Sequence, residues 1–124
     1  MLANAGARVY SVDIDSTHVY ERSPLESSYT ATPYPGGHPP LATLLAESDV
    51  VVSAVPGDTF KIRTAELARG AVCIDLSEHG NFEDDLRTRA GVFAPRLGSV
   101  TILMLKMNAL VLHCRARALT SLAE

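Results

Sequence analysis

The chain has 124 residues, of which 47% are hydrophobic and 20% charged, and its formal net charge is −3. This length and composition suit one globular domain with a single core. The small negative charge gives no electrostatic basis for binding nucleic acid, and no block of Lys and Arg predicts contact with a membrane.

The first residues predict the end of a helix followed by a strand. Residues 1–6 read as a last helical turn, with Gly6 as the left-handed residue that closes it. One turn is not a stable helix, so we expect a truncated element at the start of the chain. Ala7–Asp13 then reads as a strand that ends in the acids Asp13 and Asp15 around Ile14.

Residues 16–40 contain five prolines and a Gly-Gly pair without an apolar period. Because prolines bar regular structure, we expect a long Pro-rich surface excursion there. Leu41–Glu47 predicts a short helix with Leu41, Leu44 and Leu45 on one face.

The run Asp49–Asp58 is the strongest strand signal in the chain. Its apolar, largely β-branched core closes at Pro56-Gly57, which predicts a strand buried on both faces. Such strands are usually parallel, and their ligands lie beyond the carboxyl ends. The pattern therefore predicts an α/β sheet with its ligand near Val55, Pro56 and Gly57.

Two more strands and two helices should follow. A short helix near Thr64–Arg69, capped by Thr64 and ended by Gly70, leads to a buried strand at Ala71–Leu76, which completes a right-handed βαβ unit. Asn81 should cap a small helix through Arg89, and Val92–Ala94 should be a last strand.

A long helix should begin at Ser99 or Thr101 and run to about Leu122. Its apolar residues lie nearly all round, so we expect burial on more than one side.

Several features predict a cytoplasmic, soluble protein. Cys73 and Cys114 are too few for a disulfide framework, and we expect both to be buried in a reducing compartment. Residues 1–6 lack the basic leader and apolar core of a signal peptide. The longest apolar stretch, 100–112, is too short for a membrane span and is interrupted by Lys106.

Asp13 is the first candidate binding residue. In a nucleotide-binding α/β sheet, an acid at this strand end accepts hydrogen bonds from the adenosine ribose and repels the 2′-phosphate of NADP, which selects NAD. Asp15 could share that role, and the alternative is a solvated strand-end acid. The glycine-rich turn that should precede such a strand is missing from the sequence.

Ser77 follows a buried strand and could contact a nicotinamide or ribose. A hydrolytic set of Asp75, Ser77 and His79 is a poor alternative, because no nucleophile elbow surrounds the serine. The four histidines lack metal-ligand spacing, and no general acid or base is evident. We therefore predict no metal site and no catalytic residue.

Four ordered blocks resemble the cofactor domain of the fungal NAD-dependent methylenetetrahydrofolate dehydrogenases. They are Leu2–Asp15, Ser48–Pro56, Gly70–Asp75 and Val100–Leu105. The resemblance implies a Rossmann-like, mostly parallel α/β sheet with flanking helices that lacks its first strand and glycine-rich turn. Residues 1–124 would then form a single partial dinucleotide-binding domain, and the catalytic folate domain would be absent.

The resemblance also implies a function in one-carbon metabolism and purine biosynthesis, namely the oxidation of 5,10-methylenetetrahydrofolate to the 5,10-methenyl form with NAD as hydride acceptor. By position, Asp13 and Ile14 would contact the ribose. Val55-Pro56 and Leu76-Ser77 would line the cofactor cleft, and the loop before Thr101 would approach the nicotinamide or folate. The family implies a homodimer, with folate bound by the missing domain.

The chain departs from related bifunctional enzymes at Pro95–Thr101, which lacks their Pro-Gly-Gly-Val-Gly-Pro-Met-Thr motif and argues against cyclohydrolase activity. The missing strand predicts a weakened or rearranged sheet, because its neighbours must find new partners. We expect the fragment to be inactive alone. Two alternatives stay open: a non-catalytic nucleotide-binding or subunit-contact module, and the Rossmann half of another NAD-dependent dehydrogenase.

Overall fold

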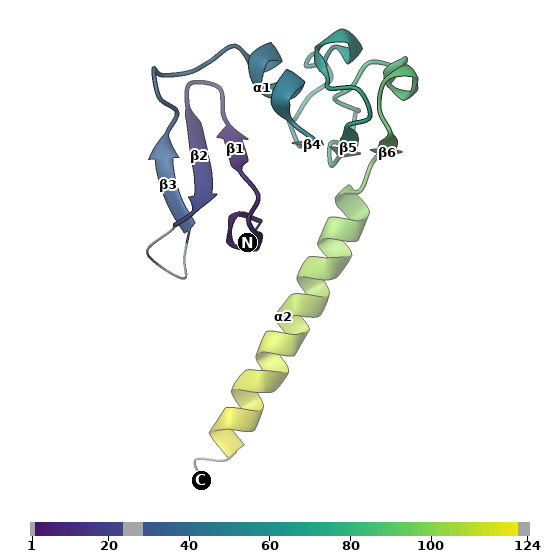
Figure 1. Ribbon diagram of the computed structural model, residues 1–124. Helices are drawn as coiled ribbons and strands as arrows, with labels where there is room; N and C mark the ends of the chain where they lie inside the picture. Colours follow the sequence, from purple (N-terminus) through teal and green to yellow (C-terminus); the bar gives the residue numbers. More distant parts are fainter. Residues whose placement is uncertain (1, 24–28, 122–124) are drawn as a thin grey trace. The chain divides into compact units, whose positions relative to one another are not determined.

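The computed structural model describes residues 2–23 and 29–121, and the side chains of its last helix as far as residue 115. The chain divides into two compact units, Met1–Glu47 and Ser48–Glu124, and each has its own three-stranded sheet (Figure 1). The α/β class that the sequence predicts is confirmed. The strand after Gly6 pairs with a strand of its own unit, and the weakening or rearrangement expected from the missing strand stays a prediction.

The first unit is an antiparallel meander. A 3₁₀ turn at Ala3–Ala5 ends at Gly6, whose φ of 93° confirms the predicted left-handed residue. Strands β1 (Val9–Val12), β2 (Thr17–Arg22) and β3 (Tyr29–Pro33) follow in the sheet order β1-β2-β3.

The prediction that residues 16–40 lack regular structure is therefore wrong. In β2, Thr17 and Val19 are buried and alternate with less buried neighbours, which is the strand period. Pro33 is compatible with β3 because it is the last residue of an edge strand, where a missing N–H is tolerated. The strand-forming residues between the prolines therefore determine the local structure.

Helix α1 (Leu41–Glu47) closes the first unit and confirms the predicted boundaries. Its Leu44 and Leu45 are buried, as the apolar spacing predicts, whereas Leu41 is only partly covered.

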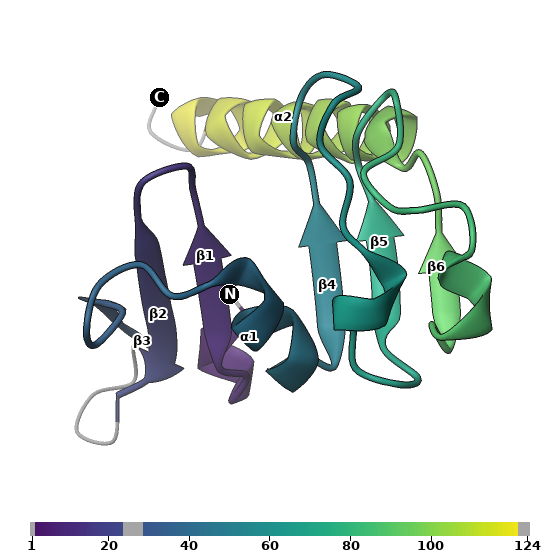
Figure 2. The same cartoon turned by 90° about the horizontal axis from the view of Figure 1, so that it is seen from above.

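The second unit holds a parallel sheet of β4 (Val50–Ser53), β5 (Val72–Asp75) and β6 (Val92–Ala94), in that order. Figure 2 shows the three strands pointing the same way. The predicted parallel pair and last strand are confirmed. The crossover between β4 and β5 contains only a 3₁₀ turn at Thr64–Glu66, and Thr64 does not cap it.

One face of this sheet is covered and the other is open. On β4, Val51 and Ser53 are buried, whereas Val50 and Val52 are each 54% exposed. The prediction of burial on both faces is wrong for this chain, because no described element covers the second face. A continuous apolar run shows that both faces of a strand are suited to burial. It does not show whether another element covers each face.

The segment between β5 and β6 also differs from prediction. Its only described helical piece is a 3₁₀ turn at Leu86–Thr88, and Asn81 caps no helix. The side chain of Asn81 is instead fully buried beside the ends of β4 and β5.

Helix α2 (Gly98–Ser121) begins and ends close to the predicted residues. Its burial is not as predicted, because every described side chain from Ser99 to Arg115 is exposed. The prediction that both cysteines are buried is right for Cys73 and wrong for Cys114, which lies on α2. Among the described residues, no helix combines the length and hydropathy that a bilayer span requires.

Candidate functional site

The candidate site is the edge of the second unit at which β4 and β5 end. Leu76 donates its N–H to the carbonyl of Ser53 at 2.8 Å, and this bond continues the ladder one step past the strands. Beyond it, the chain enters two loops that begin at Val55 and Ser77. Because the strands are parallel, the predicted cofactor-lining residues Val55, Pro56, Leu76 and Ser77 all lie near this carboxyl edge.

Asp75 is a buried carboxylate at the end of β5, with 2% of its surface exposed. Its Oδ1 accepts the Ser77 N–H at 2.9 Å and the Ser77 hydroxyl at 2.6 Å, and its Oδ2 accepts the Asn81 N–H at 2.8 Å. Desolvation acts to raise the pKa of Asp75, but these hydrogen bonds and the charge of Lys61 together hold it below its usual value. The carboxylate therefore ties the start and the end of the loop to the strand.

Asn81 uses its whole side chain to join that loop to the end of β4. Its Oδ1 accepts the Ser53 hydroxyl and the Val55 N–H, each at 2.9 Å, and its Nδ2 donates to the Val55 carbonyl at 3.0 Å. The Asn81 carbonyl accepts the Ile62 N–H at 2.7 Å. Asn81 thus connects both carboxyl-edge loops and the crossover.

Lys61 holds the part of the loop after β5 that contains His79 and Gly80. Its Nζ donates to the Gly80 carbonyl at 2.6 Å and lies 3.5 Å from the carbonyl of His79. Gly80 has a φ of 79°, a backbone conformation that side chains rarely allow. The lysine and the glycine together fix the reversal that brings Asn81 back to β5.

The start of α2 lies at the same edge. The Leu97 N–H donates to the Asp75 carbonyl at 2.9 Å, and Gly98 lies so close to Leu76 that an added Cβ would be 3.2 Å from its carbonyl oxygen. Thr101, one turn along, donates its hydroxyl to the Leu97 carbonyl at 3.1 Å. The structure therefore brings the predicted Leu76 and Ser77 close to the turn that carries Thr101.

Asp13, Ile14 and Asp15 belong to the first unit and form the tip of the β1–β2 hairpin. The Asp13 N–H donates to the Ser16 carbonyl at 2.9 Å, and the Asp13 Oδ1 accepts the Ile14 N–H at 2.8 Å. Ile14 is 95% exposed. The predicted position of Asp13 at a strand end is confirmed, and its contact with a ribose stays a prediction.

The hydrolytic alternative gains no support from the geometry. The Ser77 hydroxyl donates to Asp75 directly, and His79 contacts Lys61 through its backbone carbonyl. A serine nucleophile needs a base that takes its proton, and no described histidine lies in that position. Among the described residues, no group of His, Cys, Asp and Glu is arranged to hold a metal ion.

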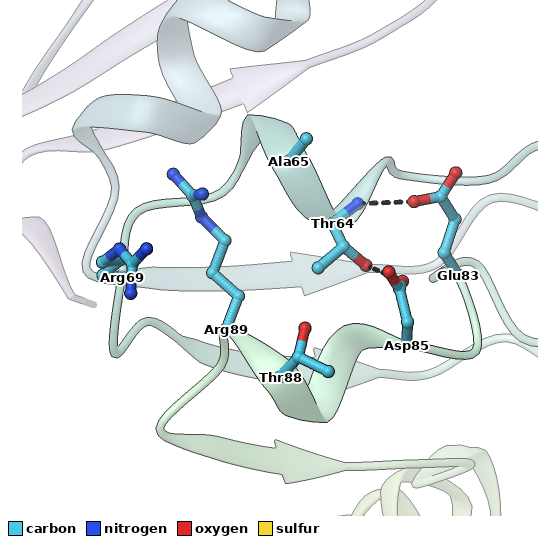
Figure 3. Close-up of a pocket in the computed structure, with 7 residues that line it drawn as sticks. All are labelled: Thr64, Ala65, Arg69, Glu83, Asp85, Thr88 and Arg89. Atoms are coloured by element: carbon cyan, nitrogen blue, oxygen red, sulfur yellow. Dashed lines mark hydrogen bonds between the residues drawn. The ribbon is translucent and has the colours of Figure 1, made fainter.

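A separate pocket of about 240 Å³ lies between the 3₁₀ turns of the second unit (Figure 3). Its acidic side is already engaged, because Glu83 accepts the Thr64 N–H and Asp85 accepts the Thr64 hydroxyl. Arg89 donates through Nε to the Leu67 carbonyl. The pocket contains none of the predicted binding residues, and its two acids balance its two arginines. Its lining residues are Thr64, Ala65, Arg69, Glu83, Asp85, Thr88 and Arg89.

The sequence reasoning missed the residues that hold the edge together, namely Ser53, Lys61 and Asn81, and gave Asp75 only a hydrolytic role. One signal was available. Ser53 and Asp75 are polar residues at paired positions of two apolar strands, and buried polar groups need partners.

No protein-family model matches the chain. It is 36% identical over 113 residues to the methylenetetrahydrofolate dehydrogenase [NAD(+)] of Saccharomyces cerevisiae, a match that covers 89% of the chain and 35% of that enzyme. The enzyme of the same name from Schizosaccharomyces pombe is 35% identical, with 87% of the chain and 34% of the enzyme covered. That of Dictyostelium discoideum is 26% identical over 110 residues.

A solved structure agrees with these sequence matches. The NAD-dependent 5,10-methylenetetrahydrofolate dehydrogenase from Saccharomyces cerevisiae superposes with a TM-score of 0.71 at 35% identity, covering 86% of the chain and 35% of that structure. The chain spans about one third of the length of the relatives it matches. The resemblance predicted from the sequence is confirmed, and the chain is a homologue of part of the NAD-dependent methylenetetrahydrofolate dehydrogenases.

Proposed function

We propose that this chain is the NAD-binding part of an oxidoreductase that converts 5,10-methylenetetrahydrofolate to 5,10-methenyltetrahydrofolate. The observation that carries the proposal is the likeness to the solved yeast enzyme, a TM-score of 0.71 at 35% identity. The relatives are named for both NAD and the folate. These names support cofactor binding in one-carbon metabolism, and we further propose that the enzyme supplies purine biosynthesis in the cytoplasm.

The carboxyl edge of the parallel sheet fits one end of a dinucleotide. Val55 and Pro56 are exposed on one loop, and Ser77 lies at the start of the other. Ligands of open α/β sheets bind beyond the strand ends, which supports placing the ribose and nicotinamide there. We assign the adenosine ribose to Asp13, whose carboxylate would also disfavour the 2′-phosphate of NADP. When bound, NAD would supply the hydride acceptor.

We propose that this chain does not catalyse the reaction alone. It corresponds to about one third of its relatives, and at the carboxyl edge the Ser77 hydroxyl and the Lys61 amine are already bonded to Asp75 and to the Gly80 carbonyl. The folate site and the homodimer contacts would then come from the whole enzyme. The net charge of −3 supports the view that nucleic acid is not a partner.

Titration of the 124-residue chain with NAD and NADP, followed by calorimetry, tests cofactor binding. We expect saturable binding of NAD and weaker binding of NADP. Equal affinity for both would remove Asp13 from its role, and no binding of either would refute the proposal. A hydride-transfer assay should show no turnover with this chain and turnover when residues matching the remaining two thirds of the yeast enzyme are joined to it.

The exposed apolar surface of α2 favours a second candidate, a subunit-contact module without catalytic function. That module would self-associate or bind a partner protein whether or not NAD is present. Sedimentation of the chain with and without NAD separates the two functions.

A further inference from the structure

The two loops of the carboxyl edge are joined by one side chain. The bond between Leu76 and Ser53 is the last of the β4–β5 ladder. Beyond it, Val55 makes no backbone–backbone hydrogen bond with any described residue. Both backbone polar groups of Val55 are instead paired with the side-chain amide of Asn81. The amide therefore takes the place that a neighbouring strand residue would occupy.

The amide itself is held in one orientation. Its oxygen accepts the Val55 N–H and its nitrogen donates to the Val55 carbonyl, so exchanging the two would face donor with donor and acceptor with acceptor. The backbone of Asn81 is fixed by Asp75 and by Ile62. With 0% exposure, Asn81 has no water to replace these partners. The path of the backbone from Val55 to Pro56 therefore depends on Asn81.

The same network sets the position of Ser77. Asp75 binds Ser77 through Oδ1 and Asn81 through Oδ2, so the carboxylate fixes both ends of one loop, and the Asn81 amide joins that loop to Val55. We propose that Asn81 is the positioning residue of the carboxyl edge, which holds Val55-Pro56 at a fixed distance from Ser77 so that a nicotinamide ribonucleotide fits between them. This inference rests on the proposed function and adds to it a residue that does not itself contact the cofactor.

Amide hydrogen exchange and NAD titration on the 124-residue chain test this role. In Asn81→Ala the Val55 amide should exchange at least about tenfold faster, whereas the Leu76 amide, bonded to Ser53, stays protected. The dissociation constant for NAD should rise about tenfold. Loss of protection confined to Val55 is a result that a general loss of stability would not give.

Asn81→Asp keeps the two acceptor contacts, but it replaces the donor to the Val55 carbonyl with an acceptor and adds a buried charge near Asp75. Val55 should stay protected, and NAD should bind about threefold to tenfold more weakly. This variant decides the question if Asn81→Ala unfolds, which loss of protection at Leu76 would reveal. Asn108→Asp, on the exposed surface of α2, is the matched control and should change neither measurement.

Continued protection of Val55 in Asn81→Ala would overturn the inference, as would unchanged NAD affinity in both Asn81 variants. If the unaltered chain does not bind NAD, the proposed function fails. In that case faster exchange of Val55 would still establish that Asn81 orients the loop, and unchanged exchange would refute it.

Discussion

Replacement of Asp75 by asparagine is the sharpest test of how the carboxyl edge is stabilised. The carboxylate accepts hydrogen bonds from Ser77 and Asn81 in a buried position. In Asp75→Asn, the amide oxygen can still accept from Ser77, but the NH₂ group faces the Asn81 N–H. One hydrogen bond to a charged group is lost and one buried donor is left without an acceptor, which together cost about 3 kcal/mol.

The measurement is urea unfolding followed by circular dichroism, with the amide signals of β5 identifying the transition of the second unit. We expect the free energy of unfolding of that unit to fall by about 3 kcal/mol at pH 7. Asp58→Asn, at an exposed position of the neighbouring loop, is the control and should change it by less than about 0.5 kcal/mol. A loss of similar size in the two variants would refute the reasoning.

The pH dependence gives a second check on the same carboxylate. Because the pKa of Asp75 is lowered in the folded chain, its contribution to stability is complete above the unfolded value of about 4. The contribution is lost as the pH falls through the lowered pKa. Unfolding curves between about pH 5 and pH 2 should therefore show a smaller loss of stability in Asp75→Asn than in the unaltered chain. Parallel curves would contradict the assignment.

Three further outcomes are expected. Asp13→Ala should reduce the preference for NAD over NADP by about tenfold in a competition titration, because a contact of about 1.5–3 kcal/mol is removed, and an unchanged ratio would count against the ribose contact. Gly91→Ala places a Cβ 2.6 Å from the Gly70 carbonyl oxygen, so thermal unfolding should show a loss of about 1–3 kcal/mol, and a neutral result would contradict the close approach. In the native chain a thiol reagent should label Cys114 and leave Cys73 unmodified, because burial shields the Cys73 thiol and raises its pKa; labelling of both at one rate would exclude this packing.

Local signals predicted the elements that depend on local interactions. The left-handed Gly6, helix α1 and the start of α2 follow from residue types and spacing within a few positions. The parallel pair β4–β5 was also predictable, because its apolar strands are separated by a crossover of ordinary length. Strands β2 and β3 were missed because the prolines around them outweighed the weaker β-branched signal.

Burial was harder to predict because it depends on the covering element. Val50, Val52 and the apolar residues of α2 have the composition of a core, yet they are exposed in this chain. The role of Asn81 was hidden for a related reason. An asparagine after a turn has the sequence context of a helix cap, and only the fold brings it beside Val55 and Ser53.

The position of Asn81 along the chain also bears on folding kinetics. Its bond to Ser53 joins residues 28 positions apart, so closing it costs loop entropy that only a formed β4–β5 ladder can offset. We therefore expect these contacts to be absent from the folding transition state. Interactions of that kind act on the unfolding rate. A bound dinucleotide should consequently slow unfolding of the second unit far more than it accelerates refolding.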